Sequence, residues 1–568
     1  MATSMQLGIL ALAGLGACGI VLETTPRIPD GWNLVEQDVD PGQPLRLSIA
    51  LREPNMQELR SKISGPSAAL RVPDQDDVDA VEKWLSNNGI THTAQENDWI
   101  YVHTTVGEAE TLLEMKMHRY QYENKDPVLR TREYSVPEPL VDAIKFVHPI
   151  GNFMAPKKEL TRKSPPKPHH RRNAPCAGET TPKCIRKLYN MPPVDPNAQS
   201  SIRLGVAGFL EENANHRDVD LFLRRNAPEI LAEGYNFTVE LVNGGENSQK
   251  PAQSGSEAAL DMDYTMALGF PSNITYYSTG GRGEKLDDNG DPYPEEFVDN
   301  EPYLELLAHL LDKLDDEIPH VLSFSYGDDE LSVPKPYAER VCSMFGLLTA
   351  RGTSILVGSG DGGAAGGRNS SCRTPDGMDV TMAAFPATCP WATAVGAVDN
   401  DSEPPKGADF SGGGFSQYFP REAWQDEAVE DYVQALGGHL CGYYNSSMRA
   451  TPDISVVGTE FQTVIARQVS LLDGTSASTP VMAAMIALVN EERIRAGKEV
   501  LGWLNGKIYS KKVRETLQDI SGGVSKSCSF ENGGGEPGGW PAAEGWDAIT
   551  GLGVPRDFQR FLRALVET

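Results

Sequence analysis

The chain has 568 residues, of which 39% are hydrophobic and 23% charged, a composition typical of globular proteins with a large core. At about 150 residues per domain, this length predicts two to four domains. The 79 acidic and 51 basic residues give a net charge of −28, which repels phosphate backbones and argues against nucleic-acid binding. This charge would shrink in acid as carboxylates protonate, so the composition is compatible with a protein that works at acid pH.

The first part of the chain is apolar over residues 6–22, which is at the short edge of a membrane span. Small residues, Ala17 and Gly19, lie near a suitable cleavage point, although no Lys or Arg precedes the apolar run. We therefore expect a signal peptide over residues 1–19, with an N-terminal anchor as the alternative. No later stretch is long and apolar enough to span a bilayer, so no stable membrane association is expected.

A small α+β domain is predicted for residues 20–155, from a helical pattern at 75–89, a strand at 98–105 and a helix at 108–117. A segment rich in Lys, Arg and Pro follows and is open to proteases. We interpret residues 156–178 as a cleavable linker, cut on acidification between about Arg171 and Pro182, rather than a plain hinge. Residues 20–155 would then be a pro-domain (activation peptide) and residues 179–568 a catalytic domain.

The remainder of the chain alternates buried strands with helices. The strand patterns are at 202–209, 321–326, 354–358 and 391–398, and a helical pattern at 337–348 lies between two of them. Buried β-branched runs that alternate with helices predict an α/β fold with a doubly wound, mostly parallel sheet.

A candidate nucleophile, Ser476, lies in the string Asp-Gly-Thr-Ser-Ala-Ser-Thr-Pro at 473–480, just before a helical run at 481–492. The hydroxyl of Ser476 would then lie near the first turn of a buried helix, where free N–H groups favour developing negative charge. The alternative is that Thr475, Ser476 or Ser478 only caps the helix.

The string resembles the nucleophile motif of the subtilisin clan, whose members need a histidine base. None of the candidate histidines of the predicted catalytic domain has the His-Gly-Thr setting of that clan: His216, His309, His320 and His439. An Asp-His-Ser triad is therefore poorly supported.

A carboxylate pair offers a different base. Glu257 and Asp261 lie four residues apart on a helical stretch at 256–266, so they share one face of the helix. Neighbouring carboxylates titrate apart, so one can accept the serine proton while the other orients it. The alternative is a solvated acidic face, but the apolar flanking residues favour burial.

A third acidic candidate, Asp361, lies in a glycine-rich segment at 358–367 directly after a predicted strand. Ligands of open α/β sheets bind beyond the carboxyl ends of the strands. The segment lacks the Gly-Lys-Ser/Thr of a phosphate loop, and the alternative is a flexible turn.

Taken in chain order, seven strings resemble the sedolisin (serine-carboxyl peptidase) family, and most closely the fungal secreted type of its tripeptidyl-peptidase branch. The resemblance covers residues 180–568, and residues 24–170 look like that family's pro-domain. The matching strings are EAALD at 257–261, VLSFSYG at 321–327, SGD at 359–361, SGGGFS at 411–416, PDIS at 452–455, GTSASTP at 474–480 and AEGWDAITGLG at 543–553.

The resemblance implies a subtilisin-like fold in which Ser476 is the nucleophile, Glu257 the general base and Asp261 the residue that orients it. Asp361 would serve the oxyanion hole, which requires a protonated carboxyl because an ionised one donates no hydrogen bond. Activity is thus expected in acid. An extra carboxylate, Asp263, would point away from Glu257 on the helix and stays outside the triad.

The resemblance also implies one structural Ca²⁺, held by the carboxylates of Asp519 and Asp547 and by the backbone carbonyls of Ile520, Ala543 and Gly545. It suggests a disulfide between Cys372 and Cys528 and leaves the other pairings among the eight cysteines open. Glycosylation sequons fit a secreted protein and begin at Asn236, Asn273, Asn369, Asn400 and Asn445.

These patterns predict a secreted serine protease that acts in acid, is made as a zymogen and releases tripeptides from free N-termini. It would work in the extracellular space or in an acidic vacuolar compartment. Its partners would be peptide and protein substrates and its own pro-domain as an intramolecular inhibitor. The alternatives are an acid endopeptidase of the same family and a catalytically inactive binding protein on the same scaffold.

Overall fold

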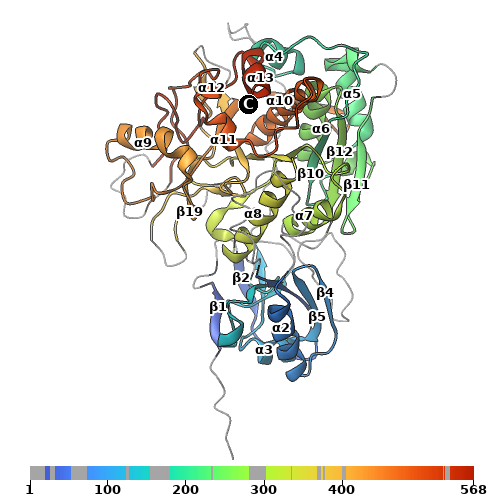
Figure 1. The fold of residues 1–568 in the computed structure, drawn as a ribbon, viewed down its shortest axis with the longest axis vertical. Helices are drawn as coiled ribbons and strands as arrows, with labels where there is room; N and C mark the ends of the chain where they lie inside the picture. Colours follow the sequence, from blue (N-terminus) through green and yellow to red (C-terminus); the bar gives the residue numbers. More distant parts are fainter. Residues whose placement is uncertain are drawn as a thin grey trace, which may run out of the picture.

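The chain forms a smaller N-terminal domain and a larger C-terminal domain in a computed structural model (Figure 1). The structure describes residues 19–25, 28, 32–52, 73–122, 127–151, 153, 176, 178–231, 235–280, 302–333, 335–366, 372–374, 378–399, 404–528, 530 and 538–568. The predicted signal peptide and linker lie almost entirely outside these residues, as do Asn369 and Asn400. Among the helices of the described part, none is both long and apolar enough to cross a membrane.

The N-terminal domain is built on a four-stranded antiparallel sheet in the order β4-β5-β3-β9, with a three-stranded sheet β2-β6-β7 and a strand pair β1-β8 beside it. Helices α2 and α3 share a hydrophobic core with one face of the larger sheet. The elements are β1 (Ile20–Thr24), β2 (Trp32–Glu36), β3 (Pro44–Leu51), α2 (Gln75–Asn87), β4 (Thr93–Glu96), β5 (Trp99–Thr105), α3 (Val106–Leu112), β6 (His118–Tyr122), β7 (Val128–Arg130), β8 (Glu133–Val136) and β9 (Ile144–His148).

Two of the three elements predicted in this domain are confirmed, the helix that became α2 and the strand that became β5. The third prediction, a helix over 108–117, was wrong at its end. Helix α3 ends at Leu112, because Glu114 adopts a φ of 48° and the chain turns into β6.

The C-terminal domain has a central sheet of eight strands in the order β11-β12-β10-β13-β15-β17-β18, with β21 also paired to β17. All its pairings are parallel except that of the two-residue strand β18, so the predicted mostly parallel sheet is confirmed. The strands are β10 (Arg203–Gly208), β11 (Thr238–Val242), β12 (Asn273–Thr279), β13 (Val321–Phe324), β15 (Ser354–Gly358), β17 (Thr393–Asp399), β18 (Lys406–Gly407) and β21 (Ile454–Val457).

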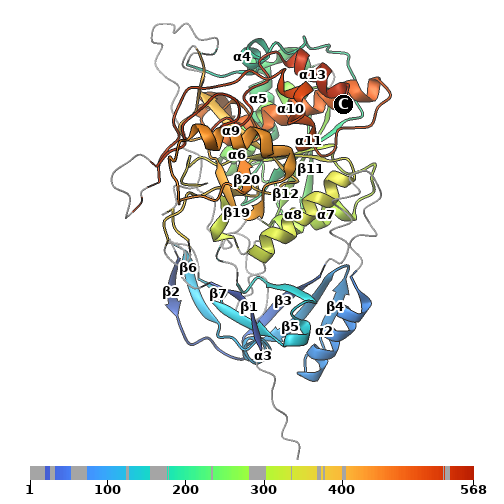
Figure 2. The same ribbon diagram turned by 60° about the vertical axis from the view of Figure 1, so that its left-hand side comes forward.

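Helices cover both faces of this sheet, as a doubly wound fold requires (Figures 1 and 2). One core cluster contains α5, α6, α10 and α13, and the other contains α7 and α8. The helices are α4 (Pro182–Leu188), α5 (His216–Asn226), α6 (Ser256–Gly269), α7 (Tyr303–Asp312), α8 (Lys335–Ala350), α9 (Asp426–Ala435), α10 (Thr475–Arg495), α11 (Asn505–Ile508), α12 (Lys511–Arg514) and α13 (Phe558–Val566).

Short antiparallel pairs complete this domain. They are β14 (Asp328–Asp329) with β16 (Ala384–Phe385), β19 (Gly414–Pro420) with β20 (Met448–Thr451), and β22 (Phe461–Ile465) with β23 (Gln468–Leu472). The β22–β23 hairpin ends three residues before α10 begins, so it leads directly to Ser476.

The two domains meet through the second face of the N-terminal sheet, which packs against helix α8. Trp99 and Phe146 from β5 and β9 belong to the same hydrophobic cluster as Tyr337 of α8. Across this contact, Asp98 forms an ion pair with Arg340, and their side chains are only 1% and 2% exposed. The Arg340 guanidinium also lies 5.1 Å from the centre of the Trp99 ring.

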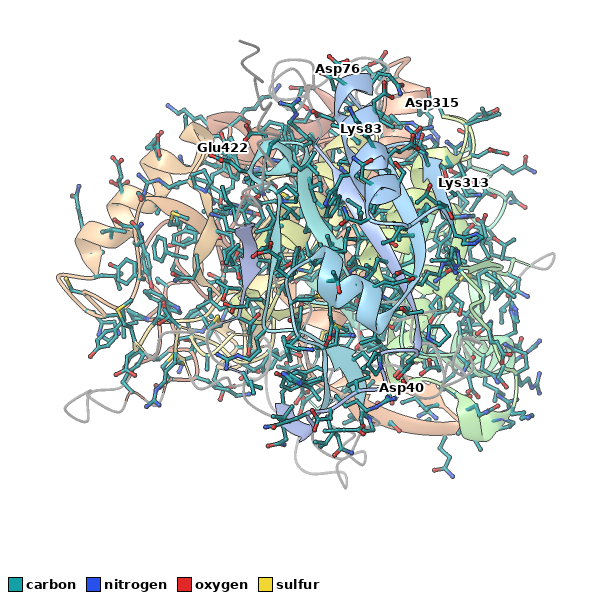
Figure 3. The ribbon with its side chains drawn as sticks, turned by 90° about the horizontal axis from the view of Figure 1, so that it is seen from below. Asp40, Asp76, Lys83, Lys313, Asp315 and Glu422 are labelled. Atoms are coloured by element: carbon teal, nitrogen blue, oxygen red, sulfur yellow. A yellow bond between two sulfur atoms is a disulfide. The ribbon has the colours of Figure 1, made fainter. Side chains whose placement is uncertain are left out.

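A histidine borders the same contact, because His148 stacks on Tyr337 with ring centres 5.5 Å apart. Burial, together with the nearby charge of Arg130, lowers the pKa of His148 to about 3. Exposed charges instead occupy the free surface of the N-terminal domain, including Asp40, Asp76 and Lys83 (Figure 3).

Three disulfides lie within the C-terminal region: Cys176–Cys184, Cys342–Cys389 and Cys372–Cys528. The last is the pair that the family resemblance suggested, so that prediction is confirmed. Cys441 is exposed and is the free cysteine of the described residues, which agrees with the expected leftover thiol.

Candidate active site

The site is built by two helices, α6 and α10, that lie side by side on one face of the sheet (Figure 1). A methyl group added to Gly269 of α6 would lie 3.6 Å from the methyl of Ala484 on α10. Eight residues earlier on each helix, Asp261 and Ser476 are joined through one intervening side chain, Ser325. The equal spacing means that the helices run parallel, so their N-terminal ends meet at the candidate nucleophile.

Ser476 is the second residue of α10 and is 5% exposed. Helix α10 begins six residues before the predicted helical run, and Gly474 is its N-cap residue, without a side-chain cap bond. The alternative in which Ser476 only caps the helix is therefore wrong. In this structure its hydroxyl donates a hydrogen bond to the carbonyl oxygen of Ser325, at 3.2 Å.

Ser325 lies just beyond the carboxyl end of β13 and links the nucleophile to the carboxylate pair. Its hydroxyl donates to Asp261 Oδ1 at 2.6 Å and lies 3.4 Å from the carbonyl oxygen of Ser476. This bond orients the Asp261 carboxyl, whose residue is fully buried. The carboxyl ends of the parallel strands lie at one edge of the sheet, and from there the residue that follows β13 reaches the first turn of α10.

Glu257 lies in the first turn of α6, one turn before Asp261, and is 2% exposed. The predicted burial of both carboxylates is therefore confirmed. The N-terminal amides of α6 are capped from outside, because Glu212 Oε2 accepts hydrogen bonds from the backbone N–H of Glu257 (2.9 Å) and of Ala258 (3.2 Å). A side chain at Gly255 would displace this carboxylate and crowd the backbone nitrogen of Asn213, so glycine favours the cap.

Two tyrosines, Tyr276 and Tyr326, border this group of carboxylates. Burial raises the pKa of each far above its usual range, and the charges of Glu212, Glu257 and Asp261 raise it further. The tyrosines thus keep their protons, and the carboxylates lie in a low-dielectric region where electrostatic effects are strong.

Asp361 follows strand β15, as predicted, and is attached to the residue before the nucleophile. Its Oδ1 accepts hydrogen bonds from the backbone N–H of Thr475, at 2.8 Å, and from the Thr475 hydroxyl, at 3.0 Å. The Nζ of Lys526 donates to the backbone carbonyl of Asp361, at 3.3 Å. The structure thus brings Asp361, Asp261 and Ser476 to one place from three separate stretches of the chain.

The candidate histidines all have partners elsewhere. His216 stacks on Phe237, His309 pairs with Glu240, and His439 contacts the carbonyl oxygen of Gly539. His320 precedes β13, at the opposite end of that strand from Ser325, and burial lowers its pKa to about 4. A histidine-dependent mechanism at Ser476 therefore has no support from their positions.

The five residues expected to hold calcium belong to two loops that contact each other. The backbone N–H of Gly545 donates to Asp519 Oδ2, and that of Ala543 donates to Asp547 Oδ2, both at 3.2 Å. Among the described residues, no three acidic, histidine or cysteine side chains converge on a metal position. A cation here would need backbone carbonyls as well, such as that of Ile520, and this mixture of oxygen donors suits Ca²⁺.

Burial raises the pKa of Asp547 to about 7, although the amides of Thr550, Ile549 and Ala543 oppose this. A nearby divalent cation would favour the ionised form of such a carboxyl. The oxygen donors of these two loops therefore suit a Ca²⁺ ion.

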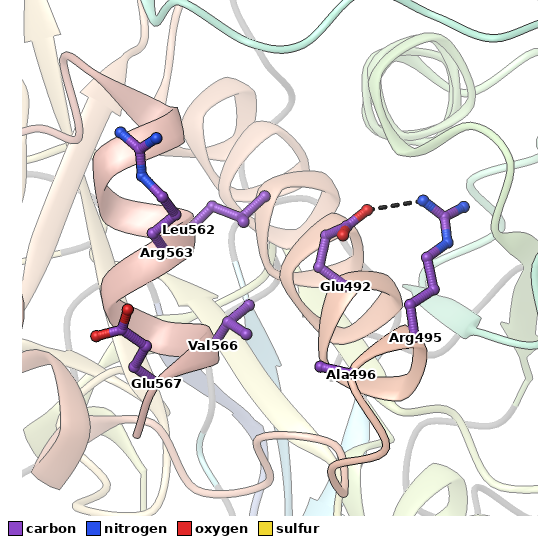
Figure 4. A pocket seen from close by; sticks show the side chains of 7 residues that line it. All are labelled: Glu492, Arg495, Ala496, Leu562, Arg563, Val566 and Glu567. Atoms are coloured by element: carbon purple, nitrogen blue, oxygen red, sulfur yellow. Dashed lines mark hydrogen bonds and ion pairs between the residues drawn. The ribbon is translucent and has the colours of Figure 1, made fainter.

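A pocket at the far end of α10 is separate from this site (Figure 4). It lies between the C-terminal ends of α10 and α13, and includes Glu492 and Leu562. At about 1.5 Å per helical residue, Glu492 lies roughly 24 Å along the helix from Ser476. Its lining therefore does not contribute to chemistry at the serine.

The spacing of residues in the sequence does not predict the roles of three residues at the site: Ser325, Glu212 and Thr475. Ser325 lies inside the string that carried the family resemblance, but only the pairing of β13 with its neighbours places it beside Ser476. Glu212 could have been suspected only from its position after strand β10.

Comparison with known proteins identifies the family to which the chain is related. Residues 30–153 match the activation domain of pro-kumamolisin, and residues 297–518 match the subtilase family. The chain is 36% identical to the tripeptidyl-peptidase SED2 of Arthroderma otae, over 96% of this chain and 96% of that protein. It is 35% identical to the tripeptidyl-peptidase sed4 of Aspergillus fumigatus, over 98% of each. Among solved structures, Pseudomonas sedolisin, a serine-carboxyl proteinase, covers 67% of this chain and is itself covered to 96%, with 17% identity and a TM-score of 0.47.

Proposed function

Because the chain belongs to the tripeptidyl-peptidase group of the sedolisin family, and is thus a serine-type peptidase with a subtilisin-like fold and a pro-domain, we propose that it is a zymogen that releases tripeptides from free N-termini. The observation that carries the proposal is the meeting of Ser476, the Glu257–Asp261 pair and Asp361 at the parallel N-terminal ends of α6 and α10. The geometry supports a Ser-Glu-Asp triad.

In this mechanism Glu257 accepts the proton of the Ser476 hydroxyl as its oxygen attacks the scissile carbonyl carbon. The hydroxyl must first turn away from the Ser325 carbonyl to which it donates. Asp261, held by the Ser325 hydroxyl, orients Glu257 from the next helical turn. An acyl-enzyme forms when Glu257 returns the proton to the leaving amine, and water then hydrolyses the ester.

Asp361 is proposed to stabilise the tetrahedral oxyanion in its protonated form. The oxygen that accepts from Thr475 can continue to do so in a neutral carboxyl, while the protonated oxygen donates to the substrate. This need for a proton is the reason to expect activity in acid. It also explains why a carboxyl, rather than an amide, would tie the enzyme to acid pH.

The N-terminal domain is proposed to act as an intramolecular inhibitor that is removed by cleavage. Residues that follow Cys176 belong to the catalytic domain, because the backbone N–H of Thr180 donates to the carbonyl of Glu460 at 2.7 Å. The Cys176–Cys184 disulfide would keep the two fragments joined after any cut between these cysteines. Release therefore requires a cut before Cys176, in the first part of the predicted range.

Calcium is proposed to stabilise the C-terminal loops through Asp519, Asp547 and the carbonyls of Ile520, Ala543 and Gly545. The ion would supply charge compensation for Asp547, which is fully buried. Removal of calcium by a chelator should lower the melting temperature of the chain, because a ligand that binds the folded state stabilises it. Calorimetry on Asp547→Ala should find that sensitivity abolished, and Asp431→Ala, on the exposed surface of α9, should retain it. Equal melting curves before and after verified metal removal would overturn the site.

Tripeptide release is tested with one peptide in two forms, N-terminally free and N-acetylated, incubated with the chain at acid pH. Mass spectrometry should detect successive loss of tripeptides from the free form alone, because an exopeptidase of this kind must bind the charged N-terminal ammonium group of its substrate. Internal cleavage of both forms would favour the alternative, an acid endopeptidase. Absence of cleavage in either form would favour an inactive binding protein.

Secretion and glycosylation complete the proposal. The relatives are fungal tripeptidyl-peptidases, and three predicted acceptor asparagines are exposed: Asn236, Asn273 and Asn445. Treatment of the secreted chain with an N-glycosidase should lower its apparent mass if any of these residues carries a glycan.

A further inference from the structure

Asp263 is a fully buried carboxyl on the face of α6 that looks away from Ser476. It lies two residues after Asp261, and so about 200° further around the helix. Its Oδ2 accepts hydrogen bonds from the Thr463 hydroxyl (2.6 Å) and the Val464 backbone N–H (3.0 Å) of strand β22. Its Oδ1 makes no hydrogen bond with the described residues and has no contact with solvent.

These bonds attach α6 to the hairpin that leads to the nucleophile. Strand β23 ends at Leu472, and α10 begins at Thr475. The next residue of α6 also reaches the hairpin, because the Tyr264 hydroxyl lies between the carbonyl of Thr180, at 2.5 Å, and that of Gln462, at 2.8 Å. A shift of the hairpin would therefore reach Ser476 through a short connection.

The charged group that acts on Asp263 is Asp218 of α5, a second buried carboxylate. Asp218 already accepts hydrogen bonds from the Ser254 hydroxyl and the Ala466 backbone N–H, and it forms an ion pair with Arg467 in the hairpin turn. Arg467 offsets part of the charge of Asp218, and the remainder still raises the pKa of Asp263.

Other titratable groups around α6 are engaged elsewhere. Arg186 of α4 donates to the carbonyls of Ala267 and Leu268, at the C-terminal end of α6. Tyr276 of β12 borders Glu257 and Asp261 on the opposite face. On the same face as Asp263, Tyr264 retains its proton because burial raises its pKa well above the usual range.

We propose that Asp263 is a positioning residue: it clamps the β22–β23 hairpin, and thereby Ser476, to the helix that carries Glu257 and Asp261. A negative charge on this buried carboxyl, whose Oδ1 has no hydrogen bond among the described residues, destabilises the clamped arrangement more than the two hydrogen bonds to β22 stabilise it. The part that concerns catalysis rests on the proposed function, whereas the clamp itself does not.

Burial raises the pKa of Asp263 well above its usual value of 3.8, and the charge of Asp218 adds to this, while the two hydrogen bonds from β22 oppose it. The folded chain therefore holds a proton that the unfolded chain loses from about pH 4 upward. Each pH unit in that window lowers the stability of the clamped state by up to tenfold in its equilibrium constant. The clamp is thus firm in acid and weakens as the pH rises.

The test is hydrogen–deuterium exchange of the hairpin peptide, residues 461–472, across pH 4 to 8 with correction for intrinsic exchange. The full chain with Ser476→Ala is used, so that self-cleavage does not interfere. Protection of the hairpin should fall at least tenfold as the pH rises, and Asp263→Asn in the same background should abolish that fall. Asn keeps the acceptor oxygen for Thr463 and Val464 but has no proton to lose. Asp220→Asn, a more exposed aspartate on α5, should behave like the parent chain.

Hairpin protection that does not change with pH in the parent chain overturns the clamp, whether or not the Asn variant folds. A fall that persists in Asp263→Asn overturns the assignment to this residue. In the active chain, Asp263→Asn should raise the pH at which incubation destroys activity irreversibly by one unit or more, and an unchanged value overturns the positioning role. The exchange result needs no turnover, so it is independent of whether tripeptides are released.

Discussion

The carboxylates of two regions of this molecule differ in their partners. At the candidate active site, Asp261 and Asp361 accept hydrogen bonds from hydroxyls and a backbone amide. At the contact between the domains, Asp98 is buried against the guanidinium of Arg340. A carboxyl held by hydroxyls and amides keeps those bonds when it gains a proton, whereas an ion pair exists only while the acid is ionised.

This difference suggests that acid pH could favour both catalysis and release of the N-terminal domain. Acid supplies the proton that the proposed oxyanion role of Asp361 requires. At the domain contact, protonation of His148, whose pKa burial lowers to about 3, would weaken docking in strong acid. The candidate active site would thus gain activity in the pH range in which the contact between the domains weakens. Variants at the active site and at the domain contact test the two parts of this comparison separately.

The largest expected effect is at the nucleophile and its base. Ser476→Ala and Glu257→Gln should each lower kcat by at least about 10³-fold, because covalent catalysis needs both groups. Peptide turnover in acid, measured on protein whose fold is checked by circular dichroism, tests this. His439→Ala should retain turnover, since the ring of this histidine is hydrogen-bonded to the Gly539 carbonyl and not to Ser476. Near-normal kcat in a folded Ser476 or Glu257 variant would remove the triad.

The next largest effect is expected when the carboxyl of Asp361, the proposed oxyanion donor, is replaced by an amide. Asp361→Asn should lower kcat by roughly 10²- to 10³-fold, the usual cost of a damaged oxyanion donor. Its remaining activity should extend to higher pH than that of the wild type, because the amide donates at any pH. The measurement is a pH–rate profile of both proteins. An alkaline limb that stays in place would show that Asp361 is not the group whose ionisation ends activity.

The sequence predicted the parts of the site that depend on local spacing. The four-residue interval placed Glu257 and Asp261 on one helix face, and the apolar flanks indicated their burial, which α6 confirms. The contribution of Ser325 depends on contacts across 64 and 151 residues of sequence, which no local pattern contains. The same holds for the Asp98–Arg340 pair and for two of the disulfides, because pairing is decided by the folded chain.

At the domain contact, Asp98→Asn should weaken docking of the N-terminal domain. It leaves the Arg340 charge buried without its counter-ion, at a cost of about 3–5 kcal/mol. Processing of the full chain, followed on gels across a pH series, should then begin at higher pH than in the wild type. Asp76→Asn, on the exposed surface of α2, is the matched control and should process normally. Unaltered processing of Asp98→Asn would mean that the ion pair does not hold the domain.

Unfolding of the N-terminal domain is a different route to release, and Glu23 argues against it. Burial raises the pKa of Glu23 to about 7, while its hydrogen bond from the Tyr134 hydroxyl opposes the shift. A carboxyl with a raised pKa in the folded state stabilises the fold more in acid and less as the pH rises from about 4.5 to 7. At this residue, acid therefore favours a folded domain, and the pH response of release is expected at the docking contact instead.

The smallest predicted effect is at His148, which stacks on Tyr337 across that contact. Burial lowers its pKa from 6.5 to about 3, so a released domain in which the ring regains solvent would bind a proton more readily between these values. Docking should thus weaken by at most about tenfold for each pH unit below 6.5. His148→Phe keeps a ring against Tyr337 but takes up no proton, so the pH midpoint of processing should move downward. His103→Phe, at an exposed histidine on β5, serves as the control. If His148→Phe and the wild type share one midpoint, the histidine does not report pH at the contact, and its burial there is only a packing feature.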